Sequence, residues 1–261
     1  MIHLPSPALI GVIHLPALPG TPRHQLPIDE ILDRAREDAR CLEACGFDAV
    51  IIENYGDAPF HADRIGPASV AAMAVVARQV IAETSLAVGI NALRNDAEAA
   101  MGIAASVSAM FVRVNVHCGV YATDQGVIQG QADRTLRYRK RLGSKVAVFA
   151  DVHVKHATPL GASNLECAAK DAAYRGLADA LIVTGPATGA PVDAEDLSSV
   201  REAVPDRRVF VGSGATVETV GSLLHLCSGV IVGSSIKIDG RPEHPVDRER
   251  ARAFVAAAGR D

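Results

Sequence analysis

The chain has 261 residues, of which 49% are apolar and 21% are charged, and its formal net charge is −4. This balance lacks the basic footprint of a nucleic-acid-binding protein, so no nucleic-acid partner is expected. The five cysteines form no CxxC pair and are odd in number, which is typical of a reducing compartment. We also find no signal-peptide pattern and no apolar stretch of about 18 residues. A cytoplasmic protein without a transmembrane segment is therefore predicted.

Eight short apolar runs recur along the chain and predict eight strands. They cover residues 8–15, 49–54, 86–91, 109–115, 145–153, 179–184, 209–211 and 230–232. Helical patterns occupy residues 29–45, 68–83, 95–106, 131–142, 163–176, 193–203 and 246–258, and a turn of small residues occupies 185–190. Uniformly apolar strands are typical of parallel sheets covered on both faces. Eight such repeats fit the roughly 250 residues of one barrel, so we predict a single (β/α)8 TIM-barrel domain over residues 1–261.

Two glycine–serine turns follow the last two predicted strands. They consist of Gly212, Ser213 and Gly214 after the seventh strand and of Gly233, Ser234 and Ser235 after the eighth. Small residues let backbone N–H groups approach a ligand, and a helix that begins there adds its positive dipole end. Many barrels hold phosphate in these two loops. We predict a phosphate site here; the alternative is that both are ordinary strand-to-helix turns.

The alternation of side chains along the strands predicts a polar cluster at the carboxyl mouth of the barrel. The inward positions that carry these polar side chains are Glu53, Asn91, Arg113, Asp151 and His153. Barrel active sites lie at this end, and an unpaired buried ion costs several kcal/mol. We therefore name these five residues as candidate catalytic residues.

The chemistry of these side chains allows several roles. Glu53 or Asp151 could act as a general base, and His153 could exchange protons near neutral pH. Arg113 could clamp a carboxylate or a phosphate group. Alternatively, Glu53, Asp151 and His153, together with His14, could hold a divalent Mg, Mn or Zn ion. In the plainest interpretation, Arg113 only forms an ion pair with Glu53 or Asp151 inside the barrel.

Two lysines and one loop lie close to this cluster in the sequence. A Schiff-base lysine is typically buried among other cations, whereas Lys155 lies past the end of its predicted strand. This position favours a loop ligand or a solvated side chain. Lys237 follows the second glycine turn and could contact the phosphate or extend into solvent. The polar loop after the fourth strand, which contains His117, Asp124 and Gln125, could form a lid or an ordinary surface loop.

A series of short motifs runs in order along nearly the whole chain. They are HLPALPG at 14–20, ENYGDAPF at 53–60, NALRND at 91–96, RVNV at 113–116, TDQG at 123–126, DVHVKHA at 151–157, VTG at 183–185, VGSG at 211–214 and VGSSIK at 232–237. With these motifs the chain resembles the BtpA/SgcQ family. The resemblance implies a fold similar to the ribulose-phosphate-binding barrels. It implies a link to photosystem I accumulation at the thylakoid surface for one branch, and to sugar-transport and phosphosugar genes for another.

We therefore weigh three functional hypotheses. The first is an enzyme, working as a homo-oligomer, that acts on a phosphorylated sugar or related phosphometabolite as an isomerase, lyase or hydrolase. The alternative is a non-enzymatic assembly or stability factor for a membrane complex such as photosystem I, with peripheral association at the membrane. The third is a sensor that binds a phosphometabolite without turnover. A scaffold does not require converging Glu, Arg, Asp and His side chains, so the predicted mouth favours the enzyme.

Overall fold

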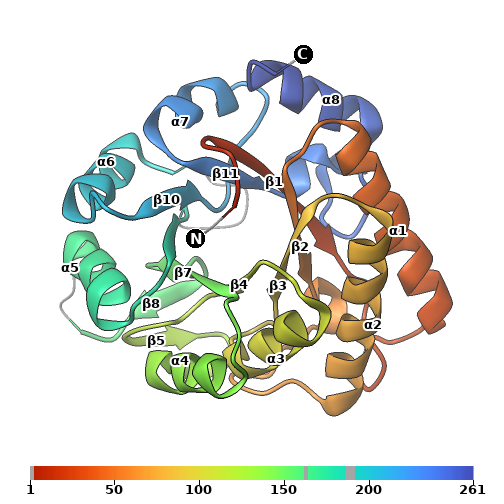
Figure 1. Ribbon diagram of the computed structural model, residues 1–261, viewed down its shortest axis with the longest axis horizontal. Coiled ribbons are helices and arrows are strands. Elements are labelled where there is room, and N and C mark those ends of the chain that lie inside the picture. The colour runs from red at the N-terminus through yellow and green to blue at the C-terminus, as the bar shows by residue number, and fades with distance from the viewer. Residues whose placement is uncertain (1–2, 162–163, 186–191, 261) are drawn as a thin grey trace.

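Eight parallel strands close into a barrel that is surrounded by helices (Figure 1). The computed structural model describes residues 3–161, 164–185 and 192–260. The barrel strands are β1 (Ala8–His14), β2 (Ala49–Glu53), β3 (Ala87–Asn91), β4 (Phe111–Val114), β7 (Ala147–Val152), β9 (Ala180–Val183), β10 (Arg208–Val211) and β11 (Gly229–Val232). Each strand pairs with the next in this order, and β11 closes on β1. The predicted TIM barrel is confirmed.

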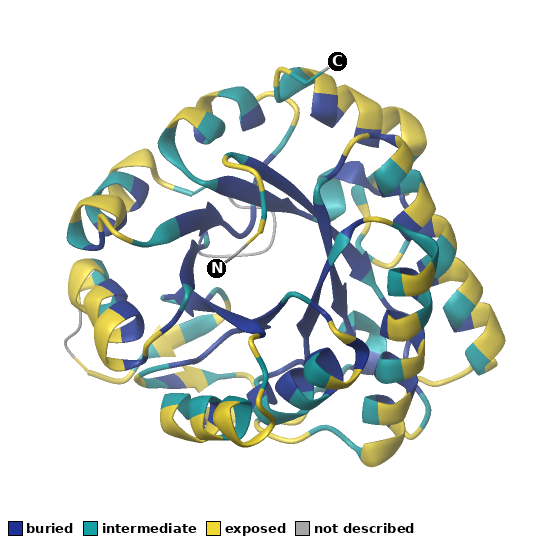
Figure 2. Cartoon of the chain, viewed as in Figure 1, coloured by how far each residue is buried: buried dark blue, intermediate teal, exposed yellow. Residues whose placement is uncertain are grey.

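The helices form the outer ring. They are α1 (Ile28–Ala44), α2 (Pro67–Glu83), α3 (Ala97–Val107), α4 (Ala132–Arg141), α5 (Leu165–Lys170), α6 (Ala194–Ala203), α7 (Val220–Leu226) and α8 (Arg248–Ala257). Their inner faces are buried and their outer faces are exposed (Figure 2). Residue 163 of one predicted helix and residues 186–190 of the predicted turn lie outside the described part of the chain. No helix within the described ranges is both long and apolar enough to cross a membrane.

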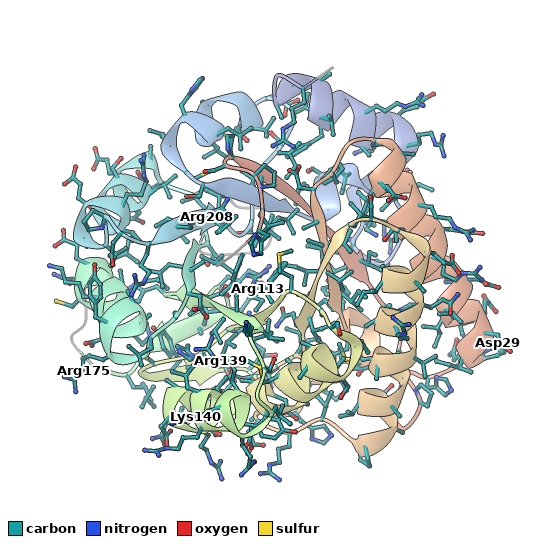
Figure 3. The ribbon with its side chains drawn as sticks, viewed as in Figure 1. Asp29, Arg113, Arg139, Lys140, Arg175 and Arg208 are labelled. Atoms are coloured by element: carbon teal, nitrogen blue, oxygen red, sulfur yellow. The ribbon has the colours of Figure 1, made fainter. Side chains whose placement is uncertain are left out.

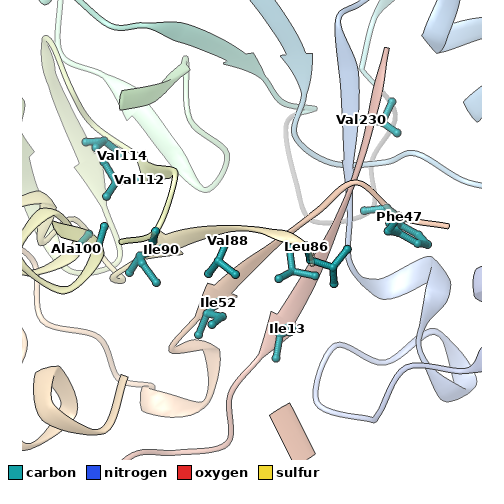
Figure 4. Packing of buried hydrophobic residues seen from close by; sticks show 14 of the residues in the cluster. Ile13, Phe47, Ile52, Leu86, Val88, Ile90, Ala100, Val112, Val114 and Val230 are labelled. Carbon is teal, nitrogen blue, oxygen red and sulfur yellow. The ribbon is translucent and has the colours of Figure 1, made fainter. Parts of the chain in front are cut away.

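The core has two layers, which follow from the alternation of side chains along each strand. Outward-facing residues such as Ile52, Val88 and Val112 pack in the layer between strands and helices (Figure 4). Inside the barrel, the Phe149 ring stacks between the rings of Phe111 and Phe210, at centroid distances of 4.4 and 5.0 Å. The barrel interior is therefore filled by apolar side chains.

The amino-terminal end of the barrel is covered by the first described residues. Leu4 packs against the inner apolar cluster, and Arg208 donates hydrogen bonds to the Leu4 and Pro5 carbonyls. A broad hollow of about 1120 Å³ also opens on this side, but its Arg139 is paired with Asp179 at 2.6 Å. Barrel chemistry lies at the carboxyl ends of the strands, so the candidate site is at the opposite end.

The predicted loop after the fourth barrel strand contains regular structure. Strands β5 (Val120–Thr123) and β6 (Gly126–Gln129) form a hairpin, and β5 also pairs with β8 (Ala157–Pro159). Tyr121 and Ile128 are buried in a small apolar cluster beneath this sheet. The sheet joins the loop after β4 to the loop after β7, so it fixes the part of the DVHVKHA motif that follows the strand.

Candidate functional site

A buried ion pair occupies the centre of the barrel mouth, where Figure 3 labels Arg113. The Arg113 Nε and Nη2 atoms donate to Oδ1 and Oδ2 of Asp151, each at 3.0 Å. Asn115 Nδ2 donates to the same Oδ2 at 3.0 Å. Burial opposes the charge of Arg113, but the Asp151 carboxylate raises the pKa of the guanidinium above its ordinary value. The expected ion pair is therefore present with Asp151, whose carboxylate is engaged rather than open to act as a base.

Asn91 supports this pair from the neighbouring strand. Its Nδ2 donates to the Arg113 carbonyl at 3.2 Å and to Asn115 Oδ1 at 3.0 Å. Its own Oδ1 is buried and has no hydrogen-bond partner among the described residues. Asn91 thus positions the centre of the mouth, although it does not itself line the cavity described below.

Glu53 and His14 form the second polar pair of the mouth. They lie opposite each other in the register of β1 and β2, with His14 Nε2 3.9 Å from Glu53 Oε1. Burial, followed by the positive charges of Lys237 and Lys155, holds the pKa of His14 well below its usual value. The imidazole is therefore neutral near pH 7 and can accept a proton. Its Nδ1 is buried and unpartnered in the described structure.

A cavity of about 210 Å³ lies between these side chains and the two glycine–serine turns. On one side it is lined by His14, Glu53, Arg113 and Lys155. On the other side it is lined by the predicted phosphate residues Gly212, Ser213, Gly214, Gly233, Ser234 and Ser235. The structure therefore brings Glu53 and Arg113 to the same cavity as the turns.

Gly212 lines the cavity, but its N–H group is not available to a ligand. Its N–H already donates to the Val183 carbonyl at 2.8 Å, because the β10 ladder extends one residue past the strand. A Cβ at this position would lie 2.3 Å from the Ile182 side chain, so the absence of a side chain serves barrel packing. No long helix adds its dipole either: α7 begins only at Val220, and β11 is followed by a short 3-10 turn, Ser234–Ile236.

The other turn residues keep polar groups free for a ligand. In the described structure, the N–H groups of Ser213, Gly214, Ser234 and Ser235 have no backbone acceptor. The Ser213 side chain is buried, and its Oγ has no partner among the described atoms. Ser235 Oγ donates to the Ala215 carbonyl at 2.9 Å and so joins the two turns. The turns thus present donors to the cavity without the help of a helix dipole.

His153 is not part of this cavity, contrary to the expected convergence. Alternation holds only within a strand, β7 ends at Val152, and His153 has a left-handed φ of 52° that turns the chain. Its ring lies 6.5 Å from the Tyr121 ring, against the small sheet. Burial lowers its pKa, while Asp196 at the start of α6 acts in the opposite direction.

The four proposed metal ligands are not gathered into one site. Asp151 is engaged by Arg113, and His153 lies outside the cavity, which leaves Glu53 and His14 together. Across the residues that the structure describes, no three His, Cys, Asp or Glu side chains are placed to share an ion.

Lys237 neither contacts the cavity nor extends into solvent. It is fully buried, and its Nζ lies 2.5 Å from Asp38 Oδ2 on α1. Asp38 Oδ1 also accepts a hydrogen bond from the Val246 N–H at 2.6 Å. Because Lys237 follows the 3-10 turn directly, this ion pair fixes the second glycine–serine turn to α1.

Two further cations lie at the mouth: Arg94, to which the sequence assigned no role, and Lys155, for which a loop ligand or a solvated side chain was expected. Arg94 is buried, and its Nη2 donates to the Lys155 carbonyl at 2.7 Å, which holds the loop after β7. The Lys155 side chain lines the cavity rather than facing solvent. Arg94 and Lys155 belong to the NALRND and DVHVKHA motifs, and this membership was the available sign of a role at the site. Alternation along a strand cannot place residues that lie beyond its end.

Comparison with known proteins agrees with this architecture. The model of the BtpA family matches residues 6–260. The chain belongs to the BtpA family. It is 46% identical over 249 residues to the photosystem I biogenesis protein BtpA of Synechocystis, with 95% of this chain and 87% of the relative covered.

Solved structures of other proteins share the fold of this chain. Phosphoribosyl anthranilate isomerase from Thermus thermophilus matches with a TM-score of 0.57 and 15% identity, covering 96% of this chain and 98% of its own. Orotidine 5'-phosphate decarboxylase from Pyrococcus horikoshii also matches with a TM-score of 0.57 and 15% identity, covering 95% and 98%. At this identity the two structures show that this BtpA-family chain shares their barrel.

Proposed function

We propose that this BtpA-family chain is an enzyme that acts on a small phosphorylated sugar or related phosphometabolite. One observation carries the proposal: a single cavity is bordered on one side by N–H groups of two glycine–serine turns that have no backbone acceptor among the described residues, and on the other by Glu53, His14 and Arg113. The turns would hold the phosphate, and the opposite side would act on the remainder of the molecule.

The size and charge of the cavity support this assignment. Its volume of about 210 Å³ is below the roughly 300–1,000 Å³ of sites for drug-sized ligands, so it suits a small metabolite. Arg113 and Lys155 add positive charge, which favours a phosphorylated ligand. The fold neighbours named as an isomerase and a decarboxylase act, by their names, on phosphorylated compounds.

The reaction that suits these side chains is proton transfer next to a carbonyl group. Glu53 would take the proton, and the neutral imidazole of His14 beside it would exchange a proton with the substrate oxygen. Isomerases and lyases both use this step; hydrolysis is the further class that a Glu–His pair allows. Arg113, held by Asp151, would orient the anionic substrate.

A second candidate function follows from a different observation. The 46% identity to a photosystem I biogenesis protein favours an assembly or stability factor for a membrane complex. Such a factor would dock through its outer surface and would not require a ligand in the barrel mouth.

Ligand-dependent thermal stability tests the proposal. Sugar phosphates, the matching free sugars and inorganic phosphate would be compared, each with and without Mg²⁺, Mn²⁺ and Zn²⁺. Binding to the native state raises Tm. We expect a larger shift from a sugar phosphate than from phosphate or the free sugar. If no compound shifts Tm, the assembly function is favoured.

The active compound would then be followed by proton NMR in D₂O. Wild-type protein should exchange the proton next to the carbonyl or convert the compound. Glu53→Gln should retain the Tm shift and lose conversion by at least a hundredfold, which is within the usual range for loss of a general base. The matched control is Glu37→Gln on the exposed face of α1. Conversion by Glu53→Gln at the wild-type rate would remove Glu53 from the mechanism.

A further inference from the structure

The five lysines of the chain occupy three different environments. Lys140, Lys145 and Lys170 are exposed, and Lys237 is fully buried in its ion pair with Asp38. Lys155 alone among them lines the barrel cavity. A lysine that lines the cavity can contact a bound molecule, whereas the exposed lysines cannot.

The backbone around Lys155 holds it at the cavity. Arg94 binds its carbonyl at 2.7 Å, and β8 begins two residues later, at Ala157, in the sheet with β5. The backbone is thus held at Lys155 itself and again two residues later, and the Lys155 side chain lines the cavity.

The charges around Lys155 leave its amine without a partner. Asp151 is engaged by Arg113, and among the described residues no carboxylate forms an ion pair with Lys155. Burial, and then the positive charge of Arg113, lower the pKa of the Lys155 amine, although Glu53 and Asp151 oppose the shift. A desolvated amine beside other cations is the arrangement that makes a lysine nucleophilic.

We propose that Lys155 is a catalytic residue that forms an imine with the carbonyl group of a small phosphorylated aldehyde or ketone. This inference rests on the proposed phosphometabolite function and narrows its substrate class. The phosphate would lie on the glycine–serine turns, and the carbonyl carbon would reach the amine on the opposite side of the same cavity.

The chemistry needs no oxidant or further reactant. The lone pair of the neutral Lys155 amine attacks the carbonyl carbon, and the C=O π pair moves to oxygen. A proton then passes from nitrogen to that oxygen, which gives a neutral carbinolamine. One proton from solvent converts the hydroxyl into water, which leaves as the nitrogen lone pair forms the C=N bond of a positively charged iminium. Glu53, which lines the same cavity, is placed to take a proton from the neighbouring carbon. The electron pair of that C–H bond forms a C=C bond, and the C=N π pair moves to nitrogen, which gives a neutral enamine.

Reductive trapping tests this step. The protein would be incubated with dihydroxyacetone phosphate, glyceraldehyde 3-phosphate or ribose 5-phosphate in the presence of sodium cyanoborohydride, which converts an imine to a stable secondary amine. Intact-mass spectrometry measures the adduct, and peptide mapping places it on one lysine. The Tm shift with the same three probes, without reductant, measures binding independently.

The variants separate a specific imine from surface glycation. We expect at least one probe to give an adduct on Lys155, Lys155→Arg to reduce it at least tenfold, and exposed Lys170→Arg to leave it unchanged. Circular dichroism checks that Lys155→Arg keeps its fold, so that loss of the adduct reports on the missing amine.

Two results would overturn the inference in distinguishable ways. A clear Tm shift with no adduct, or with equal adducts on the exposed lysines, would refute the imine and leave the phosphometabolite function standing. Absence of both shift and adduct for every probe would refute the imine with these carbonyl compounds and count against the proposed function as well.

Discussion

Arg113 and Asp151 face each other through two parallel hydrogen bonds of 3.0 Å at the centre of the barrel mouth. The pair joins β4 to the adjacent β7 and lies directly above the stacked phenylalanines of the interior. Because both groups are buried, each is needed to neutralise the other. The pair therefore lies between the apolar interior and the cavity, and its loss should mainly lower the free energy of unfolding.

Removing one partner of this pair should be more harmful than removing both. Asp151→Asn leaves Arg113 charged and buried, so we expect a loss of about 3–5 kcal/mol in the free energy of unfolding. The double variant Arg113→Met/Asp151→Leu removes both charges and should recover at least half of this loss. Urea denaturation of the single and double variants measures the difference. Equal losses in the two proteins would show that the pair is not coupled.

A negative charge at Ser213 should strongly weaken binding of a phosphorylated ligand. Its Oγ is buried and unpartnered in the described structure and lines the cavity. Ser213→Ala removes one hydrogen bond and should weaken binding by roughly two- to tenfold. Ser213→Asp adds like charge and should weaken it by at least a further tenfold. Isothermal titration with the compound that gives the largest Tm shift measures both.

The control for this position is Ser106→Asp, which adds the same charge on the exposed face of α3. It should bind the ligand as wild type does. If Ser213→Asp also retains wild-type affinity, the phosphate group does not lie on the first turn.

The barrel and much of its mouth could be predicted because both follow from regular strands. Alternation placed Glu53 and Arg113 correctly at the cavity, since each lies within a strand. It failed for His153, which lies one residue past β7 with a left-handed backbone. Alternation gave no information on Lys155. The position of this residue depends on the hydrogen bond that Arg94, distant in sequence, donates to its carbonyl.

Tertiary contacts explain the remaining differences. From its place after the second glycine turn, Lys237 is expected to contact the phosphate or to extend into solvent, yet it is buried in an ion pair with Asp38, 199 positions earlier in the chain. The hairpin of β5 and β6 escaped prediction because its strands are only four residues long and rest on a small cluster of their own. Local sequence patterns cannot predict contacts between residues that are far apart in the chain.

The Lys237–Asp38 pair should couple protein stability to the geometry of the second turn. Asp38→Asn leaves a buried lysine without its counter-ion, and we expect a loss of about 3–5 kcal/mol in the free energy of unfolding. Because Lys237 directly follows Ser234–Ile236, ligand affinity should also fall, by roughly tenfold. The control, Asp33→Asn on the exposed face of α1, should change neither quantity by much. Denaturation and titration of the two variants would check this, and unchanged affinity in a folded Asp38→Asn protein would contradict it.

His14 should make the protein sensitive to mild acid. Its folded pKa lies well below the ordinary value of 6.5 because burial and then Lys237 disfavour the imidazolium. Above pH 6.5 the group is neutral in both states and has no effect. As pH falls below 6.5, the unfolded chain takes up the proton first, so stability is lost by up to about 1.4 kcal/mol per pH unit until the folded pKa is reached.

His14→Asn removes this titration, and its stability should therefore fall less steeply than that of wild type between pH 6.5 and 4.5. The slopes come from urea denaturation at half-unit pH steps. Other histidines with lowered pKa, such as buried His117, remain in both proteins, so the difference between the slopes isolates one proton. Exposed His225→Asn is the matched control and should keep the wild-type slope. Identical slopes for wild type and His14→Asn would mean that His14 is not held neutral in the mouth, and its proposed role as a proton acceptor beside Glu53 would fall with it.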